Sequence, residues 1–285
     1  MVRLASQSAM TAALERAHDV TLVAYLLPHG PVFDALAAAS RRGAHVTVRL
    51  EGNPYLDTRG GIRRLNRSSV DELVRDGADA RLVDADSKAE SLHAKAALID
   101  GVLYVDDVNF SNGDSGTLLR DDSRRDARAL RDAVADRIDP PGREFAWRKR
   151  DALALEARLL ADARCGDDVI AESESVGSRN AVYSRLERLG RAGRSPRLLV
   201  SRQAVTGKER ALFSRLAANG VRVRICHSNE KFALAGDRAW VGSANATSAF
   251  LNPNELDWGA CTRNRAIAAH LRARFEARWQ TARET

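Results

Sequence analysis

The chain has 285 residues, of which 44% are hydrophobic and 29% are charged. This composition is close to that of an average globular protein, so it excludes a wholly disordered chain and a coiled coil. Lysine and arginine number 45 against 38 aspartate and glutamate. The resulting net charge of +7 favours anionic partners such as phosphate esters, nucleic acid or anionic lipid surfaces.

The cysteines and the apolar runs bear on the cellular location of the protein. Cys165, Cys226 and Cys261 are far apart and odd in number, and the chain has no CxxC pair. We therefore expect neither a disulfide framework nor a thiolate zinc site. The first residues lack the long apolar run of a signal peptide, and no apolar run is long enough to span a membrane. These features predict a cytoplasmic location.

The first part of the chain alternates strands with helices. Apolar runs at 19–25 and 45–50 predict two strands, and a helical segment follows the first of them. The sequence Ser-Val-Asp-Glu at 69–72 fits a capping box, which predicts that a helix begins there, after a glycine-containing loop. Strands that alternate with helices predict a mixed sheet covered by helices.

A hairpin with polar residues at its open end follows. An Asp-Gly pair at 100–101 separates two apolar runs, which predicts a tight turn between antiparallel strands. His93 and Lys95 precede the first run, and Asn109 follows the second. Because strand side chains alternate, His93 and Lys95 are expected to share a face, roughly 6.6 Å apart.

The second part of the chain repeats this pattern. Two prolines and a glycine at 140–142 end a helix, so we predict two halves, 1–139 and 143–285. Three segments of the first half resemble segments of the second half in the same order, which indicates an internal duplication. The resembling pairs are 19–25 with 168–174, 98–105 with 234–241, and 130–137 with 271–278.

A second predicted hairpin carries a similar set of polar residues. A Gly-Asp pair at 236–237 separates its two apolar runs. Asn229 and Lys231 precede the first run on one face, and Ser243 and Asn245 follow the second run. The second hairpin therefore presents a lysine and an asparagine as the first one does.

The two hairpins resemble the phospholipase D superfamily, whose H-x-K-x4-D motif is followed by a G-S-x-N segment and usually occurs twice in a chain. The matching residues are His93, Lys95, Asp100 and Asn109 in the first half, and Lys231, Ser243 and Asn245 in the second half. The second copy departs from the motif, because Asn229 stands in the place of the histidine and Gly236 in that of the aspartate. In the first copy, Asp106 and Asp107 replace the Gly-Ser pair.

The resemblance implies an α/β fold with two similar phospholipase D-like α/β halves, each a mixed sheet flanked by helices, related by a pseudo-twofold axis. It also implies one active site at the interface of the two halves. Such a site acts on a phosphodiester through a phosphohistidine intermediate, so we expect a phosphodiesterase, which is a hydrolase, or a phosphatidyl transferase. No metal and no cofactor are implied, because lysines supply the positive charge.

The chemistry explains why these residue types are required. Charge on the nonbridging oxygens of a phosphodiester must be stabilised as a nucleophile attacks, and the lysines, asparagines and serine of the two motifs are donors for it. His93 is the expected nucleophile. A second, protonated imidazole would protonate the leaving alkoxide. The second half has Asn229 at that place, which puts this step in doubt.

Further residues are candidates for a part in this chemistry. His227 lies two residues before Asn229 on the same predicted strand face, roughly 6.6 Å along the strand. It either supplies the missing proton or is an exposed histidine at a strand end. Glu255 follows Asn245 at the distance where the family commonly has an acidic residue that orients a motif group. Asp100 is either a turn residue or a residue that supports the site.

Two other functions remain open on the sequence: a catalytically degenerate member that binds phosphate-bearing ligands, and a nuclease or nucleic-acid-binding member of the same superfamily. The expected partner is a phosphodiester, either a phospholipid or nucleic acid, and no obligate protein partner is evident. The stretch 265–279 predicts a basic amphipathic helix that packs in the second half or contacts an anionic membrane surface. The sequence does not indicate which substrate is used, or whether the reaction is hydrolysis or transfer.

Overall fold

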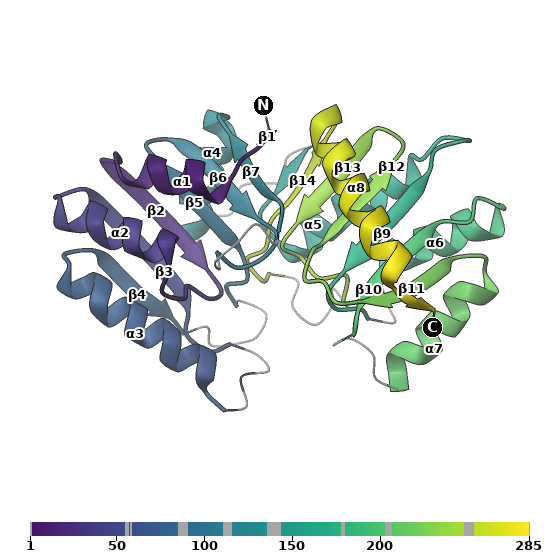
Figure 1. Cartoon of the computed structure of the whole chain (residues 1–285), viewed down its shortest axis with the longest axis horizontal. Coiled ribbons are helices and arrows are strands. Elements are labelled where there is room, and N and C mark those ends of the chain that lie inside the picture. The colour runs from purple at the N-terminus through teal and green to yellow at the C-terminus, as the bar shows by residue number, and fades with distance from the viewer. Residues whose placement is uncertain are drawn as a thin grey trace. The chain divides into compact units, whose positions relative to one another are not determined.

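The computed structural model of the chain describes residues 2–54, 57, 59–84, 91–110, 116–135, 144–177, 180–202, 207–247 and 254–284. It consists of two compact units (Figure 1). The first unit comprises Met1–Pro140 together with Asn254–Asp257, and the second comprises Pro141–Pro253 and Trp258–Thr285. A short piece from late in the sequence therefore belongs to the first unit. The proline-containing segment at 139–142 lies outside the described residues.

The first unit is built on a seven-stranded mixed sheet. Its strands are β1 (Arg3–Leu4), β2 (Asp19–Ala24), β3 (His45–Glu51), β4 (Asp79–Val83), β5 (Lys95–Ile99), β6 (Val102–Asp106) and β7 (Leu118–Asp121). Their order in the sheet is β1-β7-β6-β5-β2-β3-β4. β2, β3 and β4 run parallel, whereas the pairs from β2 through β5, β6 and β7 to β1 are antiparallel.

Helices connect and cover this sheet. They are α1 (Gln7–Leu14), α2 (Pro31–Arg41), α3 (Gly61–Arg75) and α4 (Arg124–Val134). α2 and α3 join the parallel strands, as crossover connections require. Apolar side chains of α1, α2 and α3 pack on one face of the sheet, where Leu22, Val48 and Ala97 are buried. α4 packs against β6 and buries Leu130.

The start of α3 differs from the sequence prediction. The helix begins at Gly61, directly after Gly60 in a left-handed conformation with φ of 65°, and not at the predicted capping box. Ser69 is therefore inside the helix, and its hydroxyl donates to the carbonyl oxygen of Leu27 at 2.8 Å. The serine holds α3 to the segment after β2 and does not cap the helix.

The second unit is built on an eight-stranded mixed sheet. Its strands are β8 (Phe145–Ala146), β9 (Val169–Ser173), β10 (Arg197–Ser201), β11 (Arg222–Cys226), β12 (Phe232–Ala235), β13 (Arg238–Gly242), β14 (Gly259–Thr262) and β15 (Arg283–Glu284). Their order is β15-β11-β10-β9-β12-β13-β14-β8. The six neighbouring strands β11-β10-β9-β12-β13-β14 correspond in order and direction to β4-β3-β2-β5-β6-β7 of the first unit.

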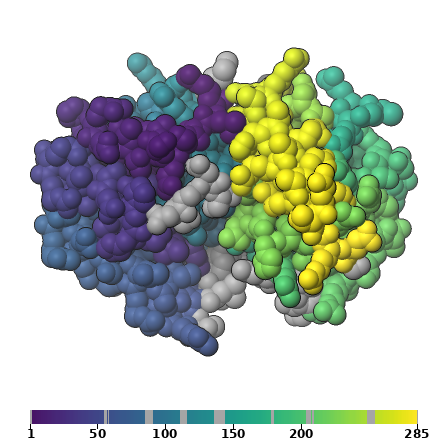
Figure 2. All heavy atoms as spheres, in the orientation of Figure 1, coloured from purple at the N-terminus to yellow at the C-terminus, as the bar shows by residue number. Residues whose placement is uncertain are grey.

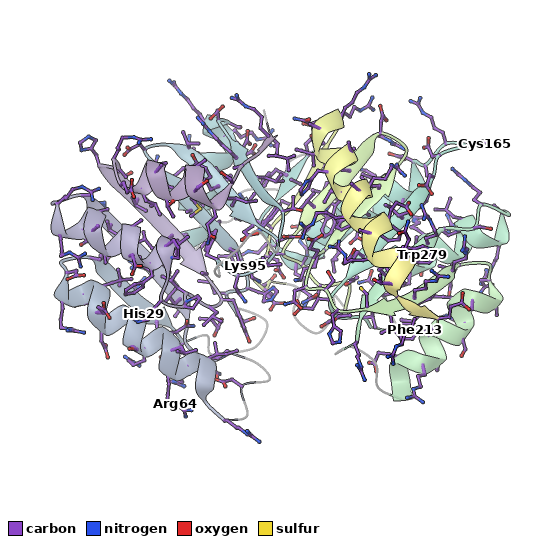
Figure 3. All side chains as sticks on the ribbon, viewed as in Figure 1. His29, Arg64, Lys95, Cys165, Phe213 and Trp279 are labelled. Atoms are coloured by element: carbon purple, nitrogen blue, oxygen red, sulfur yellow. The ribbon has the colours of Figure 1, made fainter. Side chains whose placement is uncertain are left out.

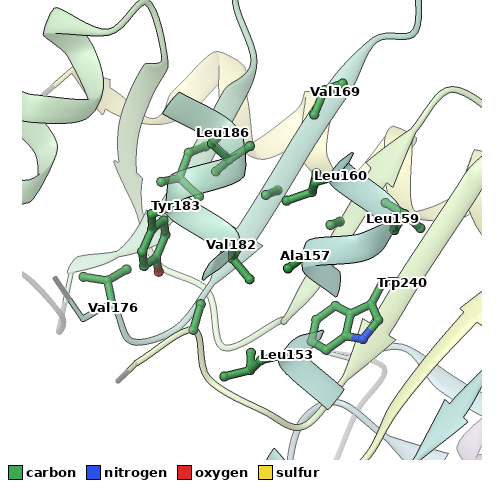
Figure 4. Packing of buried hydrophobic residues seen from close by; sticks show 14 of the residues in the cluster. Leu153, Ala157, Leu159, Leu160, Val169, Val176, Val182, Tyr183, Leu186 and Trp240 are labelled. Atoms are coloured by element: carbon green, nitrogen blue, oxygen red, sulfur yellow. The ribbon is translucent and has the colours of Figure 1, made fainter. Parts of the chain in front are cut away.

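One face of this sheet carries a hydrophobic core of the second unit. It is covered by α5 (Lys149–Ala161), α6 (Ala181–Arg191) and α7 (Gly207–Ala218). Figure 4 shows Leu153 and Leu160 of α5 with Val182 and Tyr183 of α6 in this core, which also contains Trp240 of β13. Burial of these apolar side chains drives the helices onto the sheet.

The last helix, α8 (Arg265–Thr281), covers the other face. Its apolar side chains, including Ile267, Leu271 and Trp279, are buried, and the ring of Phe275 packs edge-on against Phe232 of β12. The outer side of α8 lies on the molecular surface, in yellow in Figure 2. The prediction of a packed helix is confirmed. These apolar side chains are therefore not available to insert into a membrane surface.

The predicted fold class is confirmed, because both sheets are mixed and have helices on their faces. Both predicted hairpins are present: Ile99 pairs with Val102, and Ala235 pairs with Arg238, across two-residue loops. The sequence analysis missed β4 and β11, the third parallel strand of each sheet, and β7 and β14 after the hairpins. Within the described part of the chain, no helix is long and apolar enough to cross a membrane.

Candidate functional site

The motif residues of the first unit lie where β5 begins. His93 comes just before this strand. Lys95, which is labelled in Figure 3, is its first residue. The preceding Leu92 forms a parallel bridge with Leu256. The N–H of His93 donates to the carbonyl oxygen of Leu256 at 2.9 Å, and the N–H of Leu256 donates to that of Ser91 at 2.9 Å. The late segment of the first unit thus lies directly beside the motif histidine.

His93 is 6% exposed, and its two ring nitrogens have different neighbours. Nδ1 lies 2.8 Å from Oδ1 of Asp257, and Nε2 lies 3.1 Å from Nζ of Lys95. Because an ionised carboxylate can only accept a hydrogen bond, Nδ1 carries the hydrogen, and Nε2 keeps its lone pair in the neutral ring. The contact with Asp257 therefore fixes the tautomer and the orientation that a nucleophilic Nε2 needs.

Lys95 places a buried positive charge beside this nitrogen. The side chain is 2% exposed, and its ammonium group donates to the carbonyl oxygen of His93 at 2.6 Å. It also lies 5.7 Å from the centre of the Tyr25 ring, which packs edge-on against His93. A buried ammonium group needs such partners, because an unpaired charge is costly to bury. The ammonium group is therefore well placed to meet an anion that approaches Nε2.

Two buried residues that the sequence analysis missed support this arrangement. The carboxylate of Glu51, at the end of β3, accepts a hydrogen bond from the N–H of Leu92 at 2.6 Å. Asn66 of α3 donates to the carbonyl oxygens of Tyr25 and Glu51 at 2.8 and 2.9 Å. Burial raises the pKa of Glu51 above its usual value, although its backbone hydrogen bonds oppose this shift. Glu51 therefore fixes the chain just before His93, and Asn66 fixes the segments that hold Tyr25 and Glu51.

Asp257, which the sequence analysis did not name, contacts the ring of His93. Glu255 accepts a hydrogen bond from the hydroxyl of Ser91 at 2.9 Å. The two acids flank the bridge residue Leu256, so they stand two residues apart, and this spacing is the signal that could have identified Asp257. His93, Glu255 and Asp257 could also hold a metal ion, because one ligand atom of each lies within 4.8 Å of the others.

The other two candidates of the first half lie at opposite ends of the first hairpin. Asp100 is at the opposite end of β5, in the hairpin turn with φ of 47°. Its carboxylate accepts hydrogen bonds from the N–H groups of His18 and Asp19 at 3.0 and 2.9 Å, so it ties the turn to the start of β2. Asn109 follows β6, and its buried Oδ1 has no hydrogen-bond partner among the residues that the structure describes.

The hairpin of the second unit carries a cation but no histidine. Lys231, which is 2% exposed, forms an ion pair with Glu174 at 2.7 Å. Its ammonium group also donates to the carbonyl oxygen of Asn229 at 2.6 Å. The side chain of Asn229, in the place of the motif histidine, is exposed. The lysine is therefore held as in the first unit, but without an imidazole beside it.

Ser243 and Asn245 make contacts within the second unit. The hydroxyl of Ser243 accepts a hydrogen bond from the N–H of Trp258 at 3.0 Å. Oδ1 of Asn245 accepts one from the N–H of Ser175, which follows the ion-paired Glu174, at 3.1 Å. Asn245 therefore fixes the segment after β9 that also holds Lys231.

The prediction that His227 shares a strand face with Asn229 is wrong. β11 ends at Cys226 and β12 begins only at Phe232. These strands pair with different neighbours, β10 and β9, so the segment between them must leave the sheet. His227 is exposed and lines an open pocket together with several arginines, including Arg202.

Comparison with known families gives a match within the first unit. Residues 10–114 match the family described as cardiolipin synthase, PLD-like domain. The matched range includes His93, Lys95, Asp100 and Asn109. A search of curated proteins finds no match to the sequence. Residues 10–114 are therefore similar to a phospholipase D-like domain, as the motif resemblance implied.

Two solved structures have a fold similar to that of the chain. Polyphosphate kinase from Porphyromonas gingivalis has a TM-score of 0.69 and 14% identity, over 98% of this chain and 47% of that one. Phosphatidylserine synthase from Haemophilus influenzae Rd KW20 has a TM-score of 0.69 and 8% identity, over 100% of this chain and 87% of that one. The chain thus spans about half the length of the kinase, and at these identities the likeness concerns the fold.

Proposed function

We propose that the protein processes phosphodiesters with His93 as its nucleophile, as a phosphodiesterase or a phosphatidyl transferase. The observation that carries the proposal is the contact of His93 Nδ1 with Asp257, which leaves Nε2 beside Lys95. A histidine that only fills a core needs neither a buried carboxylate on one nitrogen nor an ammonium group on the other. Such pairings are typical of functional sites.

In the first step, Nε2 of His93 attacks the phosphorus atom. A nitrogen–phosphorus bond forms, and the bond to the leaving oxygen breaks with its electron pair, so that the leaving group departs as an alkoxide that takes up a proton. Asp257 stabilises the positive charge on the imidazole. Lys95 stabilises the negative charge on the nonbridging oxygens.

In the second step, water or an alcohol attacks the phosphohistidine. The nitrogen–phosphorus bond breaks, and the attacking oxygen gives up its proton. Water as the acceptor gives hydrolysis, and an alcohol gives transfer. The resemblance implies that Asn109 in the first half and Lys231, Ser243 and Asn245 in the second also bind the phosphate. The proposal keeps these roles, so Lys231→Ala should raise KM.

A second candidate function rests on Asn229. An amide cannot act as a general acid near neutral pH, whereas an imidazole titrates there. The charge of Lys231 is also matched by Glu174. A degenerate member that binds phosphate-bearing ligands without cleaving them is therefore the competing proposal. The substrate class is a phospholipid or nucleic acid in either case.

An aryl phosphodiester, whose leaving group needs no protonation, tests the proposal. Wild type should cleave it, and His93→Ala should lower kcat/KM by a factor of at least about 10³. His45→Ala is the matched control, because His45 also contacts an aspartate, Asp19, but its side chain is 75% exposed. His45→Ala should leave the rate unchanged.

Three outcomes would contradict the proposal. Activity that survives His93→Ala would remove this residue as nucleophile. Phosphate binding without cleavage would favour the degenerate function. Activity that is lost with a chelator and restored by a divalent cation would instead assign His93, Glu255 and Asp257 to a metal ion.

A further inference from the structure

The second unit contains a basic pocket that none of the motif residues lines. It is a cavity of about 690 Å³ beside the end of β11, the last turn of α8 and β15. Within the range of small-molecule sites, this volume accommodates more than one phosphate group. The charged or titratable side chains described along its wall are Arg202, Arg210, Cys226, His227, Arg278, Arg283 and Glu284.

Separate elements deliver the four arginines. β10 and β11 are parallel neighbours, so Arg202, just after β10, lies beside the end of β11, where His227 follows. Arg210 comes from the beginning of α7, and Arg278 from the last turn of α8. Arg283 lies on β15, opposite Ile225 of β11 in the antiparallel pair. The fold therefore gathers the positive charges.

The one carboxylate of the lining does not neutralise this charge. Glu284 forms an ion pair with Arg224, which does not line the pocket, at 3.0 Å. Among the lining arginines, Arg278 is held by the buried carboxylates of Glu172 and Glu230 at 2.8 and 2.6 Å. These carboxylates fix its guanidinium group at the wall of the pocket.

The other three arginines have no such partner. Within the described part of the chain, Arg202, Arg210 and Arg283 form no ion pair and no side-chain hydrogen bond. Burial raises the pKa of the Cys226 thiol to about 12, so this lining residue adds no negative charge at neutral pH. Like charges that share one cavity repel, and an anion relieves the repulsion.

The residue types indicate which anion fits. The planar guanidinium group matches phosphate oxygens with paired hydrogen bonds. One phosphate carries roughly 1.5 to 2 negative charges, fewer than the three unpaired guanidinium groups supply. The described residues that line the pocket include no phenylalanine, tyrosine or tryptophan, so they offer no platform on which a nucleobase would stack. We propose that this pocket binds a diphosphate group, as free pyrophosphate or as a diphosphate ester.

Isothermal titration calorimetry on the full chain at physiological salt tests the proposal, with pyrophosphate, inorganic phosphate and a nucleoside diphosphate as probes. Arg202→Ala and Arg210→Ala should each weaken pyrophosphate binding about tenfold. Both side chains are exposed and unpaired, so the variants should fold. Arg188→Ala, an exposed arginine of α6 away from the pocket, is the matched control and should bind as wild type does.

The probes separate the sources of the ligand. The proposal is supported if pyrophosphate and the nucleoside diphosphate both bind and inorganic phosphate binds more weakly. Whichever of the two diphosphates binds more tightly shows whether the pocket prefers the free or the esterified form. Retained pyrophosphate binding in Lys231→Ala supports a site separate from the motif. The proposal is overturned if pyrophosphate does not bind, if inorganic phosphate binds as tightly, or if Arg188→Ala weakens binding equally. Binding of duplex DNA without pyrophosphate would instead assign the pocket to nucleic acid.

Discussion

The two units have the same strand order around their hairpins, but the residues that begin the hairpins differ. In the first unit, His93 lies between the carboxylate of Asp257 and the ammonium group of Lys95. In the second unit, Asn229 takes the place of the histidine. A carboxylate, Glu174, contacts the lysine there. The shared topology thus places a buried lysine twice, whereas among these motif residues it is His93 of the first unit, the nucleophile of the proposed function, that a carboxylate orients.

The position of the carboxylate is the physical difference between these two hairpins. In the first unit it contacts the histidine, and Lys95 is satisfied by His93 and the ring of Tyr25. In the second unit it neutralises Lys231 directly. A carboxylate on the histidine raises nucleophilicity, while one on the lysine reduces the attraction for a phosphate. The predictions below test this asymmetry.

The largest effect is expected from Asp257→Asn. The variant keeps the size of the side chain but removes the negative charge that orients His93 and stabilises its imidazolium form. We expect kcat to fall on the order of 10³-fold with little change in KM. Glu255→Gln is the control, because its amide oxygen can still accept the hydrogen bond from Ser91. Equal losses in both variants would show that the segment is merely structural.

An intermediate effect is expected from Asn229→His, which installs the motif residue in the second hairpin. General acid catalysis contributes about 10²–10⁴ in rate, and an alkyl leaving group needs it more than an aryl one. The variant should therefore speed cleavage of an alkyl phosphodiester, by about 10²-fold, more than that of an aryl phosphodiester. The measurement is the cleavage rate of the alkyl and the aryl substrate by wild type and by the variant.

The competing explanation is that His227 already supplies the proton. In that case, Asn229→His would change little and His227→Ala would be severe. The exposed position of His227 beyond the end of β11 favours the opposite result, a small effect of His227→Ala.

The smallest effect concerns the stability of the second unit. Burial raises the pKa of Glu156, in the core side of α5, to about 8 from 4.5. The folded state therefore holds a proton that the unfolded state has lost, and stability falls as pH rises between these values. At pH 7 the loss is roughly 3 kcal/mol. Glu156→Gln should flatten the pH dependence of the free energy of unfolding, and equal slopes would contradict this.

The hairpins could be predicted from the sequence because their turns depend on local chemistry. Asp100 and Gly101 both adopt positive φ, of 47° and 83°, which the Asp-Gly pair favours. The face shared by His93 and Lys95 follows from the alternation of strand residues in the same way. Apolar runs of adequate length likewise identified β2 and β3, and the resemblance of 168–174 to 19–25 identified β9.

Features that depend on distant parts of the chain could not be predicted. Asp257 reaches His93 only because its segment pairs with the residues before β5. The local sequence predicts that Ser69 caps a helix, but its hydroxyl donates a hydrogen bond to the carbonyl oxygen of Leu27. β11 alternates arginines with apolar residues, and its neighbours β10 and β15 determine that it is a strand. Tertiary contacts override the local pattern in each case.

The most direct test of the central claim is mass spectrometry of the protein trapped during turnover of an aryl phosphodiester. The account predicts a phosphorus adduct on His93, seen in wild type and lost in His93→Ala. Because Asp257 orients the ring, Asp257→Asn should form the same adduct more slowly. An adduct on another residue, or sustained turnover without any adduct on His93, would contradict the account.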